Sequence, residues 1–135
     1  YLQPYAISVI GGVRVGLVGI TIADKTRASS RPLASTQFLD EARSAQAAID
    51  TLADQGVRHI VLITHHGYEA DKALAAQLTG VDVIIGGDSH TLLGGFTAQG
   101  LASAGPYPTA ARNKSGDPVC IGQVWEYGKA VHCVG

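Results

Sequence analysis

Side chains able to bind a metal or assist catalysis gather at two places in this sequence. The first is residues 64–67 (Thr-His-His-Gly), and the second is residues 86–91 (Gly-Gly-Asp-Ser-His-Thr). Imidazole and carboxylate groups are protein ligands for zinc, manganese and iron. The neighbouring glycines let the backbone turn sharply and leave room for a metal or an anion. Three of the five histidines therefore fall, with one aspartate, in two candidate metal-binding segments.

A predicted βαβ unit positions both segments. Residues 58–64 and 81–85 have continuous apolar centres, which is typical of strands covered on both faces, and residues 68–78 have a helical apolar stripe. Short connections of this kind make parallel strands. Ligands of open α/β sheets bind where parallel strands end, so we expect the two segments at one edge of the sheet. His59 and His132 lie away from that edge, and we expect them to be structural.

The remaining chain supplies flanking elements. Gly11-Gly12 predicts a tight hairpin between two β-rich runs, and Asp40 is a candidate cap of a helix that begins near residue 38 and ends at Gly56. The composition of residues 23–37 indicates a surface loop. Further strands are expected at residues 5–10, 13–20, 107–112, 118–125 and 129–134. We expect one α/β domain over residues 1–135.

Composition excludes several classes of protein. Basic and acidic residues number 10 and 11, the net charge is −1, and no basic stripe is visible, which argues against binding a nucleic acid polymer. No apolar run approaches the roughly 20 residues of a membrane span. The chain contains no Met and opens on Tyr1 without a leader, which we interpret as the mark of a fragment.

Two cysteines are too few for a structural zinc site. Cys120 and Cys133 lie on neighbouring apolar segments. They could pair in an oxidising compartment, or each could be a small buried hydrophobic residue. The sequence leaves both alternatives open.

The two candidate segments also carry a family resemblance. Residues 63–72 and 80–91, which contain the Thr-His-His-Gly and Gly-Gly-Asp-Ser-His-Thr motifs, resemble the 5′-nucleotidase family of calcineurin-like metallophosphoesterases. Nearly the whole chain takes part, because residues 15–21, 38–40, 105–109 and 126–129 also match in order and spacing. The resemblance implies a partial metallophosphoesterase sandwich with a βαβ unit and flanking mixed or antiparallel strands. It further implies the C-terminal portion of the catalytic domain, without its N-terminal half or the nucleotide-clamping domain.

The same resemblance implies a set of metal ligands. His65 matches the family's metal-binding histidine, and Asp88 and His90 match the positions that face the two metals. Asp88 departs from the commonest family pattern, which has histidine there. Its carboxylate either ligates, as a harder donor that favours manganese or magnesium, or only orients a neighbour; we favour ligation. His66 matches a variable position and is expected to be a neighbour. We assign no catalytic or substrate-binding residue.

The activity implied by the resemblance is hydrolysis. Two divalent metal ions of the zinc, manganese or magnesium type would activate a hydroxide for in-line attack on a nucleotide or another phosphate ester. The parent would be a 5′-nucleotidase or cyclic-nucleotide phosphodiesterase in the periplasm or outside the cell. This chain holds only part of the site, so we expect little or no activity from it alone. We also expect an exposed apolar sheet edge that self-associates or pairs with the N-terminal half.

Two other interpretations compete with an enzyme fragment. One is a free-standing module that binds a metal, a phosphate or a partner without hydrolysis. The other is a structural α/β domain whose histidines only form hydrogen bonds in loops. The opening at Tyr1 and the absence of Met favour the enzyme fragment over the free-standing module. The breadth of the family resemblance argues against the purely structural domain.

Overall fold

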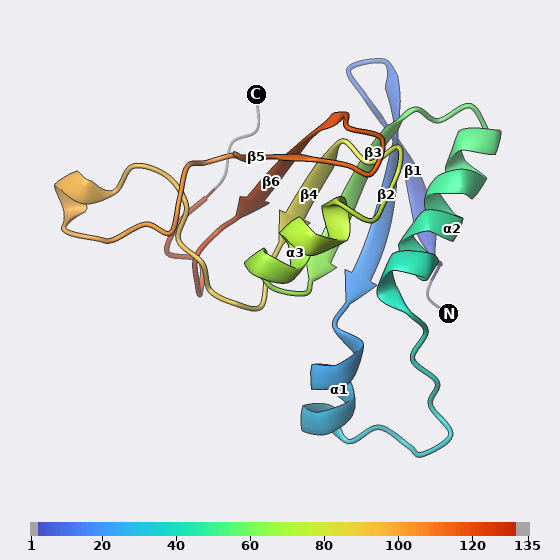
Figure 1. The fold of residues 1–135 in the computed structure, drawn as a ribbon, viewed down its shortest axis with the longest axis horizontal. Helices are drawn as coiled ribbons and strands as arrows, with labels where there is room; N and C mark the ends of the chain where they lie inside the picture. The colour runs from blue at the N-terminus through green and yellow to red at the C-terminus, as the bar shows by residue number, and fades with distance from the viewer. Residues whose placement is uncertain (1–2, 132–135) are drawn as a thin grey trace.

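The computed structural model describes residues 3–131, which form one mixed sheet of six strands with helices beside it (Figure 1). In chain order the elements are β1 (Tyr5–Ile10), β2 (Val13–Thr21), α1 (Ala23–Ser30), α2 (Glu41–Asp54), β3 (His59–His65), α3 (Tyr68–Ala75), β4 (Val83–Gly86), the 3-10 helix η1 (Thr97–Gln99), β5 (Thr109–Arg112) and β6 (Pro118–Gln123). None of the helices within residues 3–131 is long and apolar enough to cross a membrane.

The centre of the sheet is parallel and its two edges are antiparallel. The strand order is β1-β2-β3-β4-β6-β5. Strands β2, β3, β4 and β6 pair in parallel, while β1 and β5 are added through antiparallel pairing at the two edges. The β3-α3-β4 crossover and the β1–β2 hairpin are confirmed, and so is the predicted α/β class. Four strands therefore end at the same edge.

Helix α2 shows how local sequence fixes an element. The Asp40 carboxylate accepts a hydrogen bond from the Arg43 amide at 2.8 Å, which caps the first turn as predicted. Beyond the last turn, Gly56 has a φ of 76°, a conformation that favours glycine. The apolar stripe of the helix, which includes Ala45, Ile49 and Leu52, is buried against the sheet.

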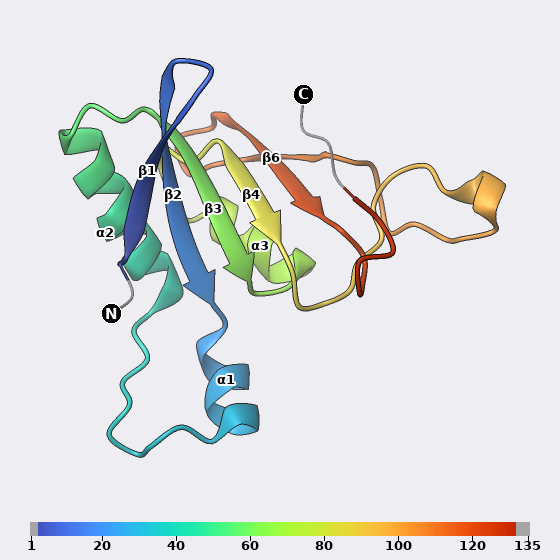
Figure 2. The ribbon, with the colours of Figure 1, turned by 180° about the vertical axis from the view of Figure 1, so that it is seen from behind.

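Within residues 3–131, the helices that pack on the sheet cover one of its two faces. Val18, Ile60 and Leu62 point to the side of α2 and α3 and join one hydrophobic core with them. Alternate residues point to the other side, where Ile63 and Ile85 remain 51% and 36% exposed. Figure 2 shows this second face, with α3 behind the strands. No helix within residues 3–131 covers it, so we call it the bare face; its central row is Gly19, Ile63, Ile85 and Gly122.

Three sequence predictions need correction. The interval 23–37 was expected to be a loop, but its first part is helix α1, whose opening amide at Ala23 donates to Glu41 Oε1 at 2.9 Å. Residues 129–131 of the predicted last strand are not a strand; the rest of that segment, with His132 and Cys133, lies outside the described residues. Cys120 is exposed on the bare face, so it is not a buried hydrophobic residue, and its pairing with Cys133 lies outside the description.

Candidate metal centre

The two predicted segments meet at the carboxyl edge of the parallel strands. Thr21 pairs with His65 across β2 and β3, and Gly86 pairs with Gln123 across β4 and β6, so four strand ends line this edge. A hydrogen bond of 3.0 Å from the Gly67 amide to the Gly87 carbonyl joins the two loops directly. The juxtaposition follows the rule for parallel sheets, and the sequence anticipated it.

Two of the predicted ligands lie next to each other. His65 Nε2 is 3.3 Å from Asp88 Oδ1, although the residues come from different loops. The His65 side chain is largely exposed, whereas that of Asp88 is only 13% exposed. A Cβ at position 87 would lie 3.2 Å from His65 Nδ1, so Gly87 leaves the imidazole its room. One nitrogen donor and one oxygen donor thus lie close together at the carboxyl edge of the sheet.

A third group reaches the same oxygen, and sequence reasoning missed it. The Lys25 ammonium group, on α1, donates a hydrogen bond to Asp88 Oδ1 and forms an ion pair with it. Lys25 lies in the interval 23–37, for which the sequence predicts a surface loop without a functional role. A usable signal existed, because α1 follows directly after the carboxyl end of β2, and residues that follow parallel strands line the ligand edge.

The third predicted ligand faces another way. His90 Nδ1 lies 3.4 Å from Glu126 Oε2, and the His90 and Tyr127 rings form a T-shaped pair with centroids 5.0 Å apart. Within residues 3–131, no three His, Cys, Asp or Glu side chains gather closely enough to hold a metal ion together. The structure therefore brings His65 and Asp88 together and leaves His90 beside Glu126.

The backbone of these loops is held in an uncommon conformation. Asp88, His90, Trp125 and Tyr127 all have positive φ angles, of 82°, 51°, 42° and 49°. A non-glycine residue in the left-handed region costs roughly 1 kcal/mol or more, and such residues concentrate at functional sites. Four such residues lie in the two facing loops. The backbone strain there lowers local stability, and it also fixes the directions in which the side chains point.

Buried Gln123 holds the strained loop in place. It is 1% exposed, and its Nε2 donates to the Gly87 carbonyl at 2.7 Å. Its Oε1 accepts from the Ser89 hydroxyl at 2.9 Å and from the Thr91 amide. Ser89 in turn accepts from the Tyr68 amide at the start of α3. One side chain from β6 therefore fixes the loop that carries Asp88 and His90. No role was predicted for Gln123 from the sequence.

A buried carboxylate lies directly beneath the two loops. Asp71, on α3, is 1% exposed; its Oδ1 accepts a hydrogen bond from Thr64 Oγ1 at 2.8 Å and lies 3.7 Å from His66 Nδ1. Burial raises the pKa of Asp71 from 3.8 to about 6, against the smaller lowering effects of the Thr64 hydrogen bond and of His66. In the described part of the chain, Asp71 Oδ2 and His66 Nδ1 have no hydrogen-bond partner.

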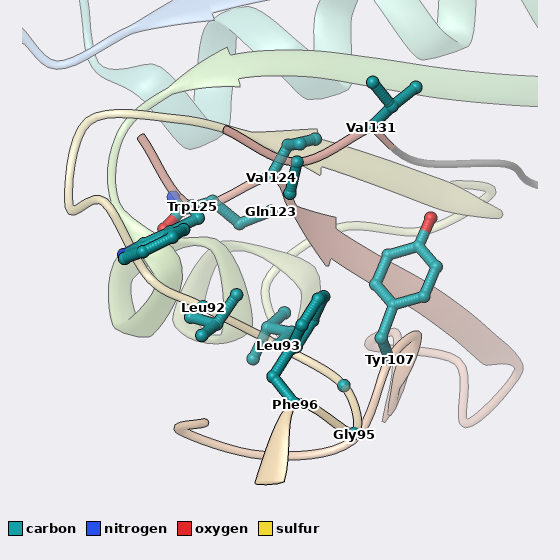
Figure 3. A pocket seen from close by; sticks show the side chains of 11 residues that line it. Leu92, Leu93, Gly95, Phe96, Tyr107, Gln123, Val124, Trp125 and Val131 are labelled. Carbon is teal, nitrogen blue, oxygen red and sulfur yellow. The ribbon is translucent and has the colours of Figure 1, made fainter. Parts of the chain in front are cut away.

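Two hollows adjoin the site. One, of about 370 Å³, is lined in part by His66, Gly67 and Asp88, which places it beside the candidate ligands. The other, of about 360 Å³, is apolar and has Gln123 in its wall. Figure 3 shows the aromatic side chains of Phe96 and Trp125 around this second hollow. Both side-chain polar atoms of Gln123 are hydrogen-bonded to the loop of residues 87–91, so the second hollow offers mainly apolar surface.

Comparison of the fold gives the class of protein. A crystal structure of a calcineurin-like phosphoesterase from Bacillus subtilis is similar over 67% of this chain and 33% of that chain, with a TM-score of 0.59 and 26% identity. The chain therefore has the fold of a calcineurin-like phosphoesterase, as the motifs predicted. No protein-family model matches the sequence.

The more similar proteins are 5′-nucleotidases. The crystal structure of a 5′-nucleotidase precursor from Thermus thermophilus is 49% identical over 93% of this chain, with a TM-score of 0.88. A probable 5′-nucleotidase of Treponema pallidum is 37% identical over 131 residues, or 96% of this chain. The resemblance to the 5′-nucleotidase family is thus confirmed. The chain spans 25% of the first protein and 22% of the second.

The residues present fit part of a metal site. Metallophosphoesterases generally use divalent metals, and an imidazole nitrogen facing a carboxylate oxygen is a suitable donor pair for such ions. The room that Gly87 leaves beside the ring supports the fit. Catalytic zinc sites take about three protein ligands, so His65 and Asp88 would supply only part of one coordination shell.

Proposed function

We propose that this chain is the C-terminal portion of the catalytic domain of a 5′-nucleotidase-type metallophosphoesterase, a hydrolase of nucleotide phosphomonoesters. The observation that carries the proposal is the 3.3 Å approach of His65 Nε2 to Asp88 Oδ1 at the carboxyl edge of the parallel strands. The likeness to 5′-nucleotidases over nearly the whole chain supports it.

The roles of the residues follow from their positions. His65 and Asp88 would hold a divalent ion of the zinc, manganese or magnesium type, and His90 is the further candidate ligand on the same loop. Two such ions, when bound, would activate water and neutralise charge on the phosphoryl oxygens. The hollow lined by His66, Gly67 and Asp88 adjoins these residues and is the place for the phosphate ester. Gln123 keeps the loop in register.

The bare face supports the domain assignment. Parallel sheets are normally covered on both faces, yet Ile63 and Ile85 stand exposed on one of them. We propose that the N-terminal half of the catalytic domain covers this face and brings the remaining metal ligands, and that copies of the chain self-associate there without it. A periplasmic or extracellular location is also proposed, supported by the description of the Thermus thermophilus relative as a precursor.

Phosphate release from adenosine 5′-monophosphate tests the function. The chain is assayed with manganese or zinc, alone and mixed with the N-terminal half of the Thermus thermophilus relative. We expect no release from the chain alone and release from the mixture. His65→Ala should abolish the activity, and His59→Ala, at the opposite end of the same strand, should preserve it.

The other outcomes are equally informative. Release from the chain alone that His65→Ala removes would mean that self-association completes the site, and the half-site proposal would be wrong. A mixture that forms a complex but releases no phosphate would favour the non-catalytic binding module.

A further inference from the structure

We infer that Lys25 is the built-in counter-ion of Asp88, and that a divalent metal ion must displace the Lys25 ammonium group in order to bind. The inference rests on the proposed function only in taking Asp88 as a metal ligand. The Lys25–Asp88 contact itself is a feature of the structure.

Lys25 and a bound metal ion would compete for the same atom, Asp88 Oδ1. Asp88 Oδ1 is the oxygen that faces His65 Nε2 at 3.3 Å, and it is also the oxygen that accepts the hydrogen bond from Lys25. A metal held by His65 and Asp88 would use this oxygen. An ammonium group and a divalent cation against the same oxygen repel each other, so one must leave.

Exposure decides which group moves. The Asp88 side chain is 13% exposed and needs a positive partner, because a carboxylate withdrawn from water is costly when it is unpaired. The Lys25 side chain is 55% exposed and has a flexible stem, so its ammonium group can return to solvent at little cost. Asp88 is thus the fixed member of the pair and Lys25 is the exchangeable one.

The backbone around Lys25 is anchored beside the site. The amide of Ala23 donates to Glu41 Oε1 at 2.9 Å, which ties the start of α1 to the start of α2. The Ile22 amide donates to the His65 carbonyl at 3.2 Å, so the segment that leads into α1 is fixed to the site loop. Arg27, the next cation on the helix, pairs with Asp24 instead. Arg27 therefore provides a matched control.

Manganese binding to the 135-residue chain tests the inference. Affinity is measured by titration calorimetry for wild type, Lys25→Met, Lys25→Arg and Arg27→Met. Removing a competing cation should tighten binding, and for a partly exposed ion pair we expect roughly a fivefold gain in Lys25→Met. Lys25→Arg keeps the charge and Arg27→Met leaves the Asp88 pair intact, so both should stay close to wild type. Unchanged or weaker binding in Lys25→Met would overturn the inference.

Amine labelling gives a second readout that does not depend on catalysis. Lys25 and the exposed reference Lys114 are acetylated, and the extents are compared by mass spectrometry. Manganese should raise labelling of Lys25 relative to Lys114, and Asp88→Asn should raise it without metal. Failure of both treatments to change the ratio would overturn the inference.

The two proposals fail in different ways. Equal manganese affinity in wild type and Lys25→Met would remove the counter-ion role but leave the metal site standing. Absence of manganese binding in both proteins would contradict the metal site itself, and the displacement inference would fall with it.

Discussion

The carboxylate of Asp71 occupies the space in which residue 86 would carry a side chain: a Cβ at Gly86 would lie 2.1 Å from Asp71 Oδ2. At this contact the buried face of α3 packs closely against the carboxyl end of β4. Asp88 follows two residues later. The position of Asp88, a candidate metal ligand, therefore depends on glycine at position 86.

Substituting Gly86 should destabilise the protein. In Gly86→Ala the new methyl group displaces a buried carboxylate, and overpacking of this kind costs about 1–3 kcal/mol or more. The measurement is the free energy of unfolding in urea. Gly95→Ala is the control, because Gly95 is exposed outside the strands, a Cβ there meets nothing within 4 Å, and surface changes of this kind stay within about 0.5 kcal/mol. Equal effects of the two substitutions would contradict the tight Asp71–Gly86 packing.

Asp71 should make stability depend on pH in an unusual direction. Its pKa is raised by burial to about 6, so the folded state binds a proton that the unfolded state has already lost. The stabilisation from protonated Asp71 is therefore at its maximum below about pH 4 and is lost as the pH rises to about 6. The free energy of unfolding falls by roughly 3 kcal/mol over this range. Asp71→Asn abolishes this slope.

The measured quantity is the difference in unfolding free energy between wild type and Asp71→Asn, followed from pH 4 to pH 7. Taking the difference cancels the titration of other groups. His66 Nδ1 lies 3.7 Å from Asp71 Oδ1, so the comparison is repeated with His66→Gln in both proteins. A difference that rises with pH would show that the Asp71 carboxylate is stabilised in its charged form.

Metal binding to the isolated chain should be weak. His65 and Asp88 would supply two donors, and no group of three His, Cys, Asp or Glu side chains gathers within residues 3–131. Calorimetric titration with zinc or manganese should show weak binding that His65→Ala reduces further. His59→Ala should not change it, because His59 lies at the other end of β3. Tight binding at two sites would refute the half-site interpretation.

The bare face should make the chain associate. Ile63 is 51% exposed at the centre of this face, and burying such residues between two copies is favourable. Light scattering should show oligomers for wild type and a shift toward monomer for Ile63→Lys. Leu39→Lys is the control, because Leu39 is 72% exposed but lies outside the strands. A wild type that stays monomeric would count against the exposed face as an interface.

Much of the fold could be predicted because its signals are local. The Gly11-Gly12 hairpin, the Asp40 cap and the continuous apolar centres of β3 and β4 each lie within a few residues of the structure they specify. Helix α1 could not be predicted in this way. It buries only Ala23, so it has no apolar stripe, and a contact with Glu41, 18 residues further on, holds its first turn.

The sequence by itself determined which two loops meet at the candidate site. Parallel strands end at one edge of a sheet, and that rule alone predicts that the loops of His65 and Asp88 lie together. Only the tertiary structure decided what each side chain meets there. It put Lys25 on Asp88 across 63 residues of sequence and His90 beside Glu126. Left-handed backbone at Asp88 and His90 sets these directions, and long-range packing holds that conformation against local preference.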